Sequence, residues 1–469
     1  MNAIATSAAA VASHANECAW AQAPTTTHAS GPLPERGEFV IRGAHVISMD
    51  PTVGDLPRGD LHVRNGEIVA VGPSLAVPEA ETIDASGMIL MPGFVDTHWH
   101  LWSSTFRALI KLNDPRDSYF PLTLRLGKLC TPEDSYRAVR LGLLEALLTG
   151  ITTLHNWSHN VLTPAHADAE VRALQEFGIR GRFSYGWGQD LPVDRPMDMA
   201  DIARIQRQWF ANSDLLQLGV AMRTPVAYQR GAVDIDVLKQ DWNGARSLGL
   251  PITMHTRQSS VATLERHGLL GPDVQLVHPQ ALTLDEIAII AARKVNVSAS
   301  PIIEMLYSQS TRGEIQFAEL LEAGVQQSLS VDTVAAAGKA DFFAVMRALI
   351  SAHGQRFGDK KPLSPRRLLE LATLDGARAL NMAERVGSLT PGKRADVILL
   401  RTADVNMTPM GDDPAYMIVF AAQPANVDTV IVDGRVLVRN GQLTSVDVTS
   451  VMREASNSAR ELRARDRAR

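Results

Sequence analysis

Short apolar runs alternate with helix-patterned stretches through the middle of the chain. The helix-patterned stretches include Thr131–Leu148 and Leu284–Ala292. Strands that alternate with helices at this spacing predict parallel βα units, and eight such units predict a (β/α)8, or TIM, barrel. A doubly wound open sheet is the alternative architecture that the same pattern allows. The eight strand-like runs are Gly93–Asp96, Ile151–His155, Ile179–Tyr185, Leu215–Met222, Pro251–His255, Val274–His278, Val295–Ser298 and Ser328–Asp332.

A β-type pattern appears on both sides of this middle region. The dipeptides Asn65-Gly66, Asp433-Gly434 and Asn440-Gly441 favour tight turns between strands. Two separated β-rich stretches that flank a barrel predict one small β-sandwich assembled from both ends of the chain. The β-type segments are Phe39–Met49, Asp60–Val71 and Glu81–Leu90 before the barrel, and Asp396–Leu400 and Val427–Val438 after it.

The expected domain boundaries follow from these patterns. Residues 37–90 and 390–445 form the two parts of the sandwich, and residues 91–389 form the barrel. Residues 1–36 are rich in Ala, Thr, Ser and Pro, which predicts a flexible extension. Residues 446–469 mix arginines with acidic residues, which predicts a solvated helical tail.

Composition limits the classes of function. The 469 residues include 46 basic and 51 acidic side chains, so no strong basic field exists to bind nucleic acid or an anionic membrane. No apolar run reaches the roughly 18 residues that span a bilayer. Two cysteines, Cys18 and Cys130, cannot form a disulfide framework, and no basic residue precedes the faint signal-peptidase pattern at 19–23. A cytoplasmic location, with neither nucleic acid nor membrane as a partner, is therefore expected.

Histidines and one aspartate stand where the predicted barrel strands end, and active sites of such barrels lie at those ends. His98 and His100 follow the first strand, and residues two apart in an extended segment share a face. His255, His278 and Asp332 end the fifth, sixth and eighth runs. Imidazoles and a carboxylate are ligands that Zn²⁺ or Fe²⁺ accepts with an open position for water. The set predicts a metal site, although any one of these histidines alone would more often be structural, and Asp332 alone could cap a turn.

Several motifs resemble the amidohydrolase superfamily. Met91–His100, which reads MPGFVDTHWH, is similar to its first-strand signature, and Pro391–Asp396 resembles the segment with which the family re-enters its sandwich. Ile252–His255, Leu276–His278 and Ser330–Asp332 are similar to its fifth, sixth and eighth strands. The similarity runs from about residue 38 to residue 445 and is closest to the cytosine deaminase and triazine hydrolase branch.

The resemblance implies a site with one divalent metal ion. Zinc is the first choice, with Fe²⁺, Mn²⁺ and Co²⁺ as alternatives. His278 would face the substrate without binding the metal. Relatives with two metals often carry a carboxylated lysine at the end of strand four, where this chain reads Met222-Arg223-Thr224. The family also implies a homo-oligomer, either a dimer or a tetramer. The four implied ligands are His98, His100, His255 and Asp332.

The implied reaction is hydrolysis of a C–N bond in a small planar molecule: an amide, amidine, carbamate or amino-heterocycle. A metal-activated water would attack the carbon. Asp332 would take a proton from that water and pass it to the leaving nitrogen, and His278 would polarise the substrate or stabilise the developing oxyanion. Two alternatives remain open: a non-hydrolytic lyase or decarboxylase that uses the same metal, and a binding protein that has lost catalysis.

The chain departs from its branch at the acid that moves protons in the deaminases. Those relatives carry Glu three residues after the strand-five histidine, where this chain has Gln258, a candidate for contacting the substrate. An amide cannot relay a proton as a carboxylic acid does. Glu304, shortly past the seventh run, is a candidate to replace this acid or to bind a cationic or N–H group of the substrate. A surface position on a loop or first helical turn is the alternative for Glu304.

Further residues near the motifs are candidates for contacting the substrate. Trp99 and Trp102 would suit a planar or apolar molecule. His155 and His159, which lie at and just past the end of the second run, would line the pocket or have a packing or capping role. Arg223 would meet a substrate carboxylate or pair with a neighbouring acid.

Overall fold

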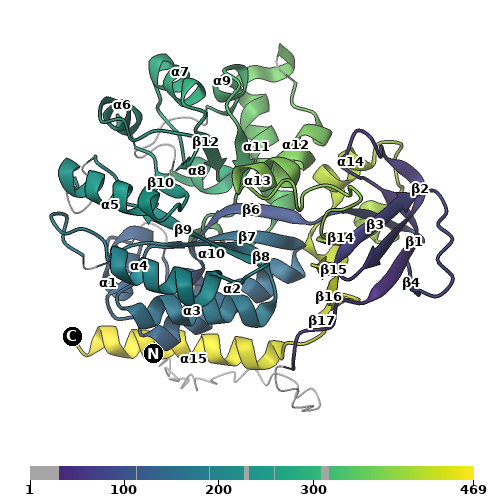
Figure 1. The fold of residues 1–469 in the computed structure, drawn as a ribbon, viewed down its shortest axis with the longest axis horizontal. Helices are drawn as coiled ribbons and strands as arrows, with labels where there is room; N and C mark the ends of the chain where they lie inside the picture. Colours follow the sequence, from purple (N-terminus) through teal and green to yellow (C-terminus); the bar gives the residue numbers. More distant parts are fainter. Residues whose placement is uncertain are drawn as a thin grey trace, which may run out of the picture.

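Eight parallel strands follow one another in sequence order around a barrel in the computed structural model (Figure 1). All eight lie where the apolar runs predict them, so the (β/α)8 barrel is confirmed and the open sheet is not formed. The strands are β6 (Phe94–Trp99), β7 (Ile151–Ser158), β8 (Arg180–Tyr185), β9 (Leu216–Met222), β10 (Ile252–His255), β11 (Val274–Val277), β12 (Asn296–Ala299) and β13 (Gln327–Leu329).

The structure describes residues 31–111, 114–189, 191–226, 232–257, 259–307, 316–360 and 362–469. Cys18 and Gln258 lie outside these ranges, and Cys130 is buried. Across the described ranges, no helix is both long enough and apolar enough to span a bilayer.

Backbone hydrogen bonds between the first and last strands close the barrel. Trp99 and Asp332 form a parallel bridge just beyond the end of β13. The amide of His100 donates to the carbonyl of Asp332 at 2.7 Å, and the amide of Asp332 donates to the carbonyl of His98 at 2.9 Å. These bonds remove a free sheet edge and place the ends of the first and eighth strands side by side.

Helices surround the barrel (Figure 1). In α2 (Pro132–Leu148), Thr131 accepts a hydrogen bond from the amide of Asp134 and the Asp134 side chain accepts one from the amide of Thr131. This capping box sets the start of the helix that the sequence predicts. The second expected helix, α7 (Leu284–Ala292), begins with the same kind of box. The other helices of the barrel region are η1 (Leu101–Ala108), α1 (Tyr119–Gly127), α3 (Pro164–Phe177), α4 (Met199–Ile205), η2 (Gln206–Phe210), α5 (Ile235–Ser247), α6 (Ser260–Arg266), α8 (Pro301–Tyr307), α9 (Phe317–Glu322), α10 (Val334–Ala337), α11 (Phe342–Phe357), η4 (Gly358–Lys360), α12 (Pro365–Ala372) and α13 (Leu374–Ala379).

Strands from both ends of the chain share a second, mixed sheet, which confirms the composite β domain. β5 pairs with antiparallel β14, with Leu90 opposite Leu399. The three expected hairpins are formed by β2 with β3, β15 with β16 and β16 with β17. Asn65, Asp433 and Asn440 and the glycine after each have positive φ, as tight hairpin turns require. The strands are β1 (Glu38–Val46), β2 (Leu56–Arg64), β3 (Glu67–Gly72), β4 (Glu81–Asp84), β5 (Met88–Pro92), β14 (Val397–Arg401), β15 (Val427–Val432), β16 (Arg435–Arg439) and β17 (Gln442–Leu443).

Short helices lie between β14 and β15 of this sheet, and one long helix follows it. The short ones are η5 (Val405–Met407), α14 (Pro414–Tyr416), η6 (Met417–Ala421) and η7 (Pro424–Asn426). The C-terminal helix, α15 (Val448–Arg467), forms in the segment where a helical tail is expected. It packs on α2 and η1, so one of its faces is buried where the sequence suggests a solvated tail. The buried residues of this face are Val451, Ala455, Ser458, Ala459 and Leu462.

Residues 31–36, which belong to the expected flexible extension, lie against the folded chain. Leu33 packs on the main hydrophobic core, and Arg36 forms an ion pair with Asp433. These contacts give the last part of the extension a fixed place on the fold.

A buried ion-pair network joins the barrel to the second sheet. Arg180, the first residue of β8, lies 2.6 Å from Asp396, which precedes β14, and 3.1 Å from Asp433, in the β15–β16 turn. All three side chains are at most 2 % exposed. Burial alone would lower the pKa of Arg180, but the two carboxylates outweigh burial and raise it. The second sheet is therefore attached near the amino-terminal end of a barrel strand, away from the carboxyl ends of the strands.

Replacing this arginine should destabilise the protein strongly. Arg180→Met should lower the free energy of unfolding by about 3–5 kcal/mol, because two buried carboxylates lose their partner. Urea denaturation followed by circular dichroism measures the change. Arg293, which pairs with Glu265 on the surface, gives a matched control, and Arg293→Met should leave the unfolding midpoint nearly unchanged. Equal effects of the two substitutions would show that the buried network has no special role.

Candidate active site

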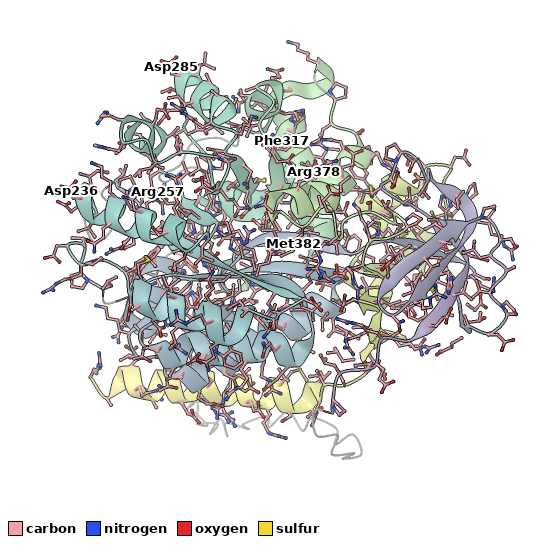
Figure 2. The ribbon with its side chains drawn as sticks, viewed as in Figure 1. Asp236, Arg257, Asp285, Phe317, Arg378 and Met382 are labelled. Carbon is pink, nitrogen blue, oxygen red and sulfur yellow. The ribbon has the colours of Figure 1, made fainter. Side chains whose placement is uncertain are left out.

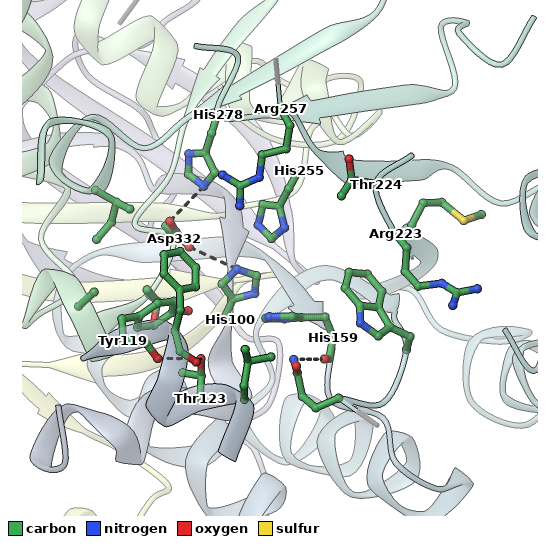
Figure 3. Close-up of a pocket in the computed structure, with 18 of the residues that line it drawn as sticks. His100, Tyr119, Thr123, His159, Arg223, Thr224, His255, Arg257, His278 and Asp332 are labelled. Atoms are coloured by element: carbon green, nitrogen blue, oxygen red, sulfur yellow. Dashed lines mark hydrogen bonds and ion pairs between the residues drawn. The ribbon is translucent and has the colours of Figure 1, made fainter. Parts of the chain in front are cut away.

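A cavity opens at the end of the barrel that holds the carboxyl ends of the strands (Figure 3). His100, His255, His278 and Asp332 all line it, so residues from the first, fifth, sixth and eighth strands meet as the sequence predicts. His98 lies next to them and is fully buried. The cavity has a volume of about 150 Å³, which is a size for a small molecule.

The nitrogen and oxygen atoms of these five side chains converge. Nε2 of His98 lies 3.2 Å from Nε2 of His255 and 3.5 Å from Oδ1 of Asp332. The same Oδ1 lies 3.3 Å from Nε2 of His100, and Oδ2 of Asp332 lies 3.1 Å from Nε2 of His278. Two possible ligand groups share His98: one adds His100 and His255, and the other adds His278 and Asp332.

These separations fit a bound metal ion. With Zn–N and Zn–O bonds of about 2.0–2.2 Å, ligand atoms at the corners of a tetrahedron lie about 3.3–3.6 Å apart. The Nδ1–H of His100 donates to the carbonyl of Trp157 at 3.0 Å, which leaves the lone pair of Nε2 directed at the cluster. Lone pairs of His98 and His255 that face each other at 3.2 Å would repel, and a cation between them removes the repulsion. The donor set therefore suits a divalent cation.

The surroundings keep His98, His100 and His255 neutral and Asp332 ionised. Burial lowers the pKa of His98 to about 4 and that of His100 to about 3, and it holds the pKa of His255 well below its ordinary value. Burial alone would raise the pKa of Asp332, but His278 and His98 outweigh it, so that pKa lies well below its usual range. Neutral imidazoles and an ionised carboxylate are the forms that bind a metal cation.

Hydrogen bonds to a buried carboxylate fix the backbone next to the possible ligands. The buried carboxylate of Asp96 accepts hydrogen bonds from the amide of His98 at 3.0 Å and from the amide of Val331 at 3.1 Å. Asp332 has φ of 66° and His278 has φ of 57°, in the left-handed region that residues other than glycine rarely adopt. Such conformations persist where the surrounding structure imposes them, and they concentrate at functional sites.

Glu304 lies behind His278 and does not take the surface position that is the alternative for it. It is in α8, is 1 % exposed, and is not among the described residues that line the cavity. Its Oε1 lies 3.1 Å from Nδ1 of His278 and accepts a hydrogen bond from the amide of Ser300 at 2.9 Å. The carboxylate thus contacts the imidazole and not the cavity, because the first turn of α8 packs inward.

His155 and Trp99 are buried in the barrel and do not line the cavity. Nδ1 of His155 lies 2.9 Å from the carbonyl of Thr97, and its Nε2 lies 2.6 Å from the hydroxyl of Ser184. Both ring nitrogens are engaged within the barrel, so the packing role is the one that the structure shows for His155.

His159 does line the cavity, and Trp102 supports it. The Nε1–H of Trp102 donates to Nδ1 of His159 at 3.1 Å. The ring centroid of His159 lies 4.2 Å from that of His100. Trp102 is itself buried outside the cavity lining, so it positions a neighbour and does not face the substrate.

Arg223 lines the cavity, but its guanidinium is paired. It lies 2.9 Å from the carboxylate of Asp241 and donates to the carbonyls of Pro192 and Arg195 at 2.8 and 2.6 Å. Of the two expected roles for Arg223, pairing with a neighbouring acid is the one that the structure shows. Gln258, the substrate candidate that follows strand five, lies outside the described residues.

Some lining residues have no counterpart in the sequence predictions. Arg257 follows His255 by two positions, and the alternation of an extended segment could have placed it on the same face. Figure 2 shows Arg257 at the end of the barrel away from the second sheet. Aromatic residues from separate helices and loops form one wall of the cavity, and no local sequence pattern marks them. This aromatic wall consists of Tyr119, Phe120, Trp187 and Tyr307.

Comparison with known proteins identifies the family. A family model described as the amidohydrolase family matches residues 89–437. The 5-methylthioadenosine/S-adenosylhomocysteine deaminase of Desulforudis audaxviator is 32% identical over 442 residues, which cover 90% of this chain and 99% of that protein. The 5'-deoxyadenosine deaminase of Methanosarcina acetivorans is 28% identical over 450 residues, with 91% and 99% covered. Atrazine chlorohydrolase from Arthrobacter aurescens, solved with zinc, has a TM-score of 0.78 at 22% identity, with 90% of this chain and 100% of that chain covered.

The chain therefore belongs to the amidohydrolase family. The resemblance to the amidohydrolase superfamily is confirmed, and the curated relatives reported above are named as deaminases. Membership and these relatives make the protein a hydrolase that cleaves a carbon–nitrogen bond of a small molecule.

The metal-free protein should lose stability as the pH falls from about 7 to about 4. The ordinary pKa of histidine is 6.5, and that of His98 in the folded chain is about 4. Between these values the unfolded chain binds more protons than the folded chain, so added protons favour unfolding. Thermal melts of chelated protein across this range measure the effect, and His98→Asn should reduce the slope. A midpoint that stays constant or rises on acidification would contradict the prediction.

Proposed function

We propose that the protein is a hydrolase with a single zinc ion. The proposal rests on the convergence of ligand atoms at separations of 3.2–3.5 Å at the cavity. The zinc in the atrazine chlorohydrolase structure supports the choice of metal, and Fe²⁺, Mn²⁺ or Co²⁺ would suit the same donors. The end of β9 reads Met222-Arg223-Thr224, with no lysine or carboxylate for a second ion. The proposed ligands are His98, His100, His255 and Asp332.

A zinc ion at this position would lower the pKa of a water molecule to about 7 and polarise the substrate. The two oxygens of Asp332 have different neighbours: Oδ1 faces His98 and His100, and Oδ2 faces His278. Asp332 is ionised at neutral pH, so it can accept a proton from the attacking water and return it to the leaving nitrogen.

His278 would contact the substrate beside the reacting carbon, and Glu304 would hold it there. The Glu304 carboxylate accepts the Nδ1–H of His278, so the ring is fixed with Nε2 toward Asp332 and the cavity. Glu304 is therefore a positioning residue in this proposal, and it does not touch the substrate.

The proposed substrate is a small planar molecule with a cleavable amide, amidine, carbamate or amino-heterocycle group. The aromatic wall of the cavity supports a planar shape. The relatives are named for deamination of 5'-deoxyadenosine and of methylthioadenosine or S-adenosylhomocysteine. Gln258 stands where deaminases of the branch carry Glu, so we assign the handling of the leaving nitrogen to Asp332 and His278.

We further propose a cytoplasmic homo-oligomer, a dimer or a tetramer. The scarcity of cysteine supports the location. Family membership supports the assembly.

Elemental analysis tests the metal site directly. Protein purified without chelators should contain about one zinc ion per chain. His98→Ala should lower that content to near zero, because His98 belongs to both possible ligand groups. His166, a buried histidine that contacts Thr163 and Cys130, gives a matched control, and His166→Gln should keep the metal.

Two outcomes would overturn this assignment. A zinc content near two per chain would reveal a second ion and a bridging ligand, and folded protein that takes up no added zinc would exclude the metal site. Ammonia release then sorts the substrates: release from 5'-deoxyadenosine would assign an amino-heterocycle, and release from simple aromatic amides alone would assign an amide.

Glu304→Gln should lower kcat by about 10- to 100-fold while the zinc content and KM stay near the wild-type values. The amide holds the imidazole of His278 less firmly than the carboxylate does, but it leaves the proposed ligands in place. Steady-state kinetics and elemental analysis on the same preparation measure both effects. Glu286, a buried carboxylate that caps α7, gives the control, and Glu286→Gln should keep full kcat. Full turnover by Glu304→Gln would remove the positioning role.

A further inference from the structure

The segment of residues 191–197, which lies between β8 and α4, forms part of the cavity wall. Leu191 and Val193 line the cavity, while Pro192 between them is exposed. This alternation is that of an extended chain, in which every second side chain points to the same side. The side chains that point inward are apolar, so the segment offers the cavity a surface for an apolar body.

One buried ion pair holds this segment at three points. The guanidinium of Arg223 donates to the carbonyls of Pro192 and Arg195 at 2.8 and 2.6 Å. It also lies 2.9 Å from the carboxylate of Asp241, which accepts a hydrogen bond from the amide of Met197 at 2.8 Å. The side chains of the pair are 5 % and 1 % exposed. This pair, the Arg223–Asp241 clasp, therefore ties a loop segment to the end of β9 and to α5.

The clasp is directed at the loop and not at the proposed reaction centre. Figure 3 shows the guanidinium of Arg223 turned away from the rings of His100 and His255. Arg223 follows Met222, the last residue of β9, and Asp241 lies within α5. Loops are otherwise the more mobile parts of a fold. Because both anchors belong to or adjoin regular elements of the barrel, the clasp fixes this wall relative to the strand ends.

We propose that the Arg223–Asp241 clasp determines substrate specificity by holding residues 191–197 as a fixed apolar wall against which the planar body of the substrate packs; this inference rests on the proposed function of the same cavity. Leu191 and Val193 would contact that body, and the proposed metal site would hold the reacting group. A wall that is already ordered binds without a further entropic cost of ordering the loop. Arg223 and Asp241 act through the segment, so both are positioning residues.

Calorimetric titration of the zinc-loaded full chain tests this inference with two probes that differ by one fused ring. The probes are benzohydroxamate and 2-naphthohydroxamate, in which the hydroxamate group binds zinc and the rings extend into the cavity. The wild type should bind the naphthyl probe about ten-fold more tightly, because the second ring buries more apolar surface against the wall. Arg223→Met/Asp241→Leu should reduce this ratio to about three-fold or less, because the loop must then be ordered on binding.

The double variant removes the clasp without leaving a buried charge. Burial raises the pKa of the Asp241 carboxyl, so Arg223→Met alone would leave a costly group in the interior. Replacing both members of a buried ion pair by apolar residues is often neutral for stability. Arg223→Lys should retain part of the probe ratio, because lysine keeps the ion pair and can donate to one of the carbonyls.

A second ion pair of α5 gives the matched control. Arg246 lies 2.7 Å from Asp273, which precedes β11, and neither is among the described residues that line the cavity. Arg246→Met/Asp273→Leu makes the same exchange of a charged pair for an apolar pair on the same helix. This variant should keep the wild-type ratio of the two probes.

Hydrogen–deuterium exchange separates loosening of the segment from its effect on binding. The amides of residues 191–197 should exchange at least about ten-fold faster in the double variant than in the wild type. Faster exchange together with a wild-type probe ratio would give the clasp a structural role only and overturn the inference. Equal binding of both probes by the wild type would overturn it as well.

The zinc content of each preparation is measured in parallel. Wild-type protein that contains no zinc and binds neither hydroxamate would contradict the proposed function. Zinc-loaded protein whose probe ratio is unaffected by loss of the clasp would contradict the specificity role alone.

Discussion

Closure of the barrel between its first and last strands is the constraint on which the rest of the site depends. Across this junction the amide of His100 donates to the carbonyl of Asp332, and the amide of Asp332 donates to the carbonyl of His98. The carboxylate of Asp96 also joins the two strands, because it accepts from the amides of His98 and Val331. The junction places the two histidines of the first strand against an aspartate from the far end of the barrel sequence. Because a closed barrel has no free edge, its strands cannot slip in register without breaking the whole ladder. The ligand positions are therefore as rigid as the barrel.

Burial and neighbouring hydrogen bonds then prepare the side chains for metal chemistry. Burial lowers the pKa values of His98 and His100, so their lone pairs are available at neutral pH. The carbonyl of Trp157 and the carboxylate of Glu304 fix the orientation of the rings that they contact. The site is thus arranged before any ligand arrives, which is the condition under which fixed charges and dipoles are most effective in catalysis.

Elements outside the barrel support the walls of the cavity. α15 contributes Ala459 and Leu462 to a hydrophobic cluster that also holds Leu122 of α1. Arg125 of α1 pairs with Asp466 of α15 at 2.9 Å. Since α1 carries two of the aromatic residues of the cavity, the C-terminal helix stabilises one wall of the site from outside. The second sheet is attached near the start of β8, so it supports the barrel without covering the cavity.

Local patterns in the sequence determined the fold class, the hairpins and the residues at the strand ends. Apolar runs of strand length, Asn-Gly and Asp-Gly turns and the spacing of His98 and His100 act over a few residues, so they can be read without knowing what packs against them. The tertiary structure alone decided which polar side chains face the cavity. Glu304 turned toward His278, Arg223 toward an acid on a neighbouring helix, and Arg257 into the cavity. The directions of Glu304 and Arg223 are set by partners that are distant in sequence, and the packing of those partners is not encoded in any single stretch of the chain.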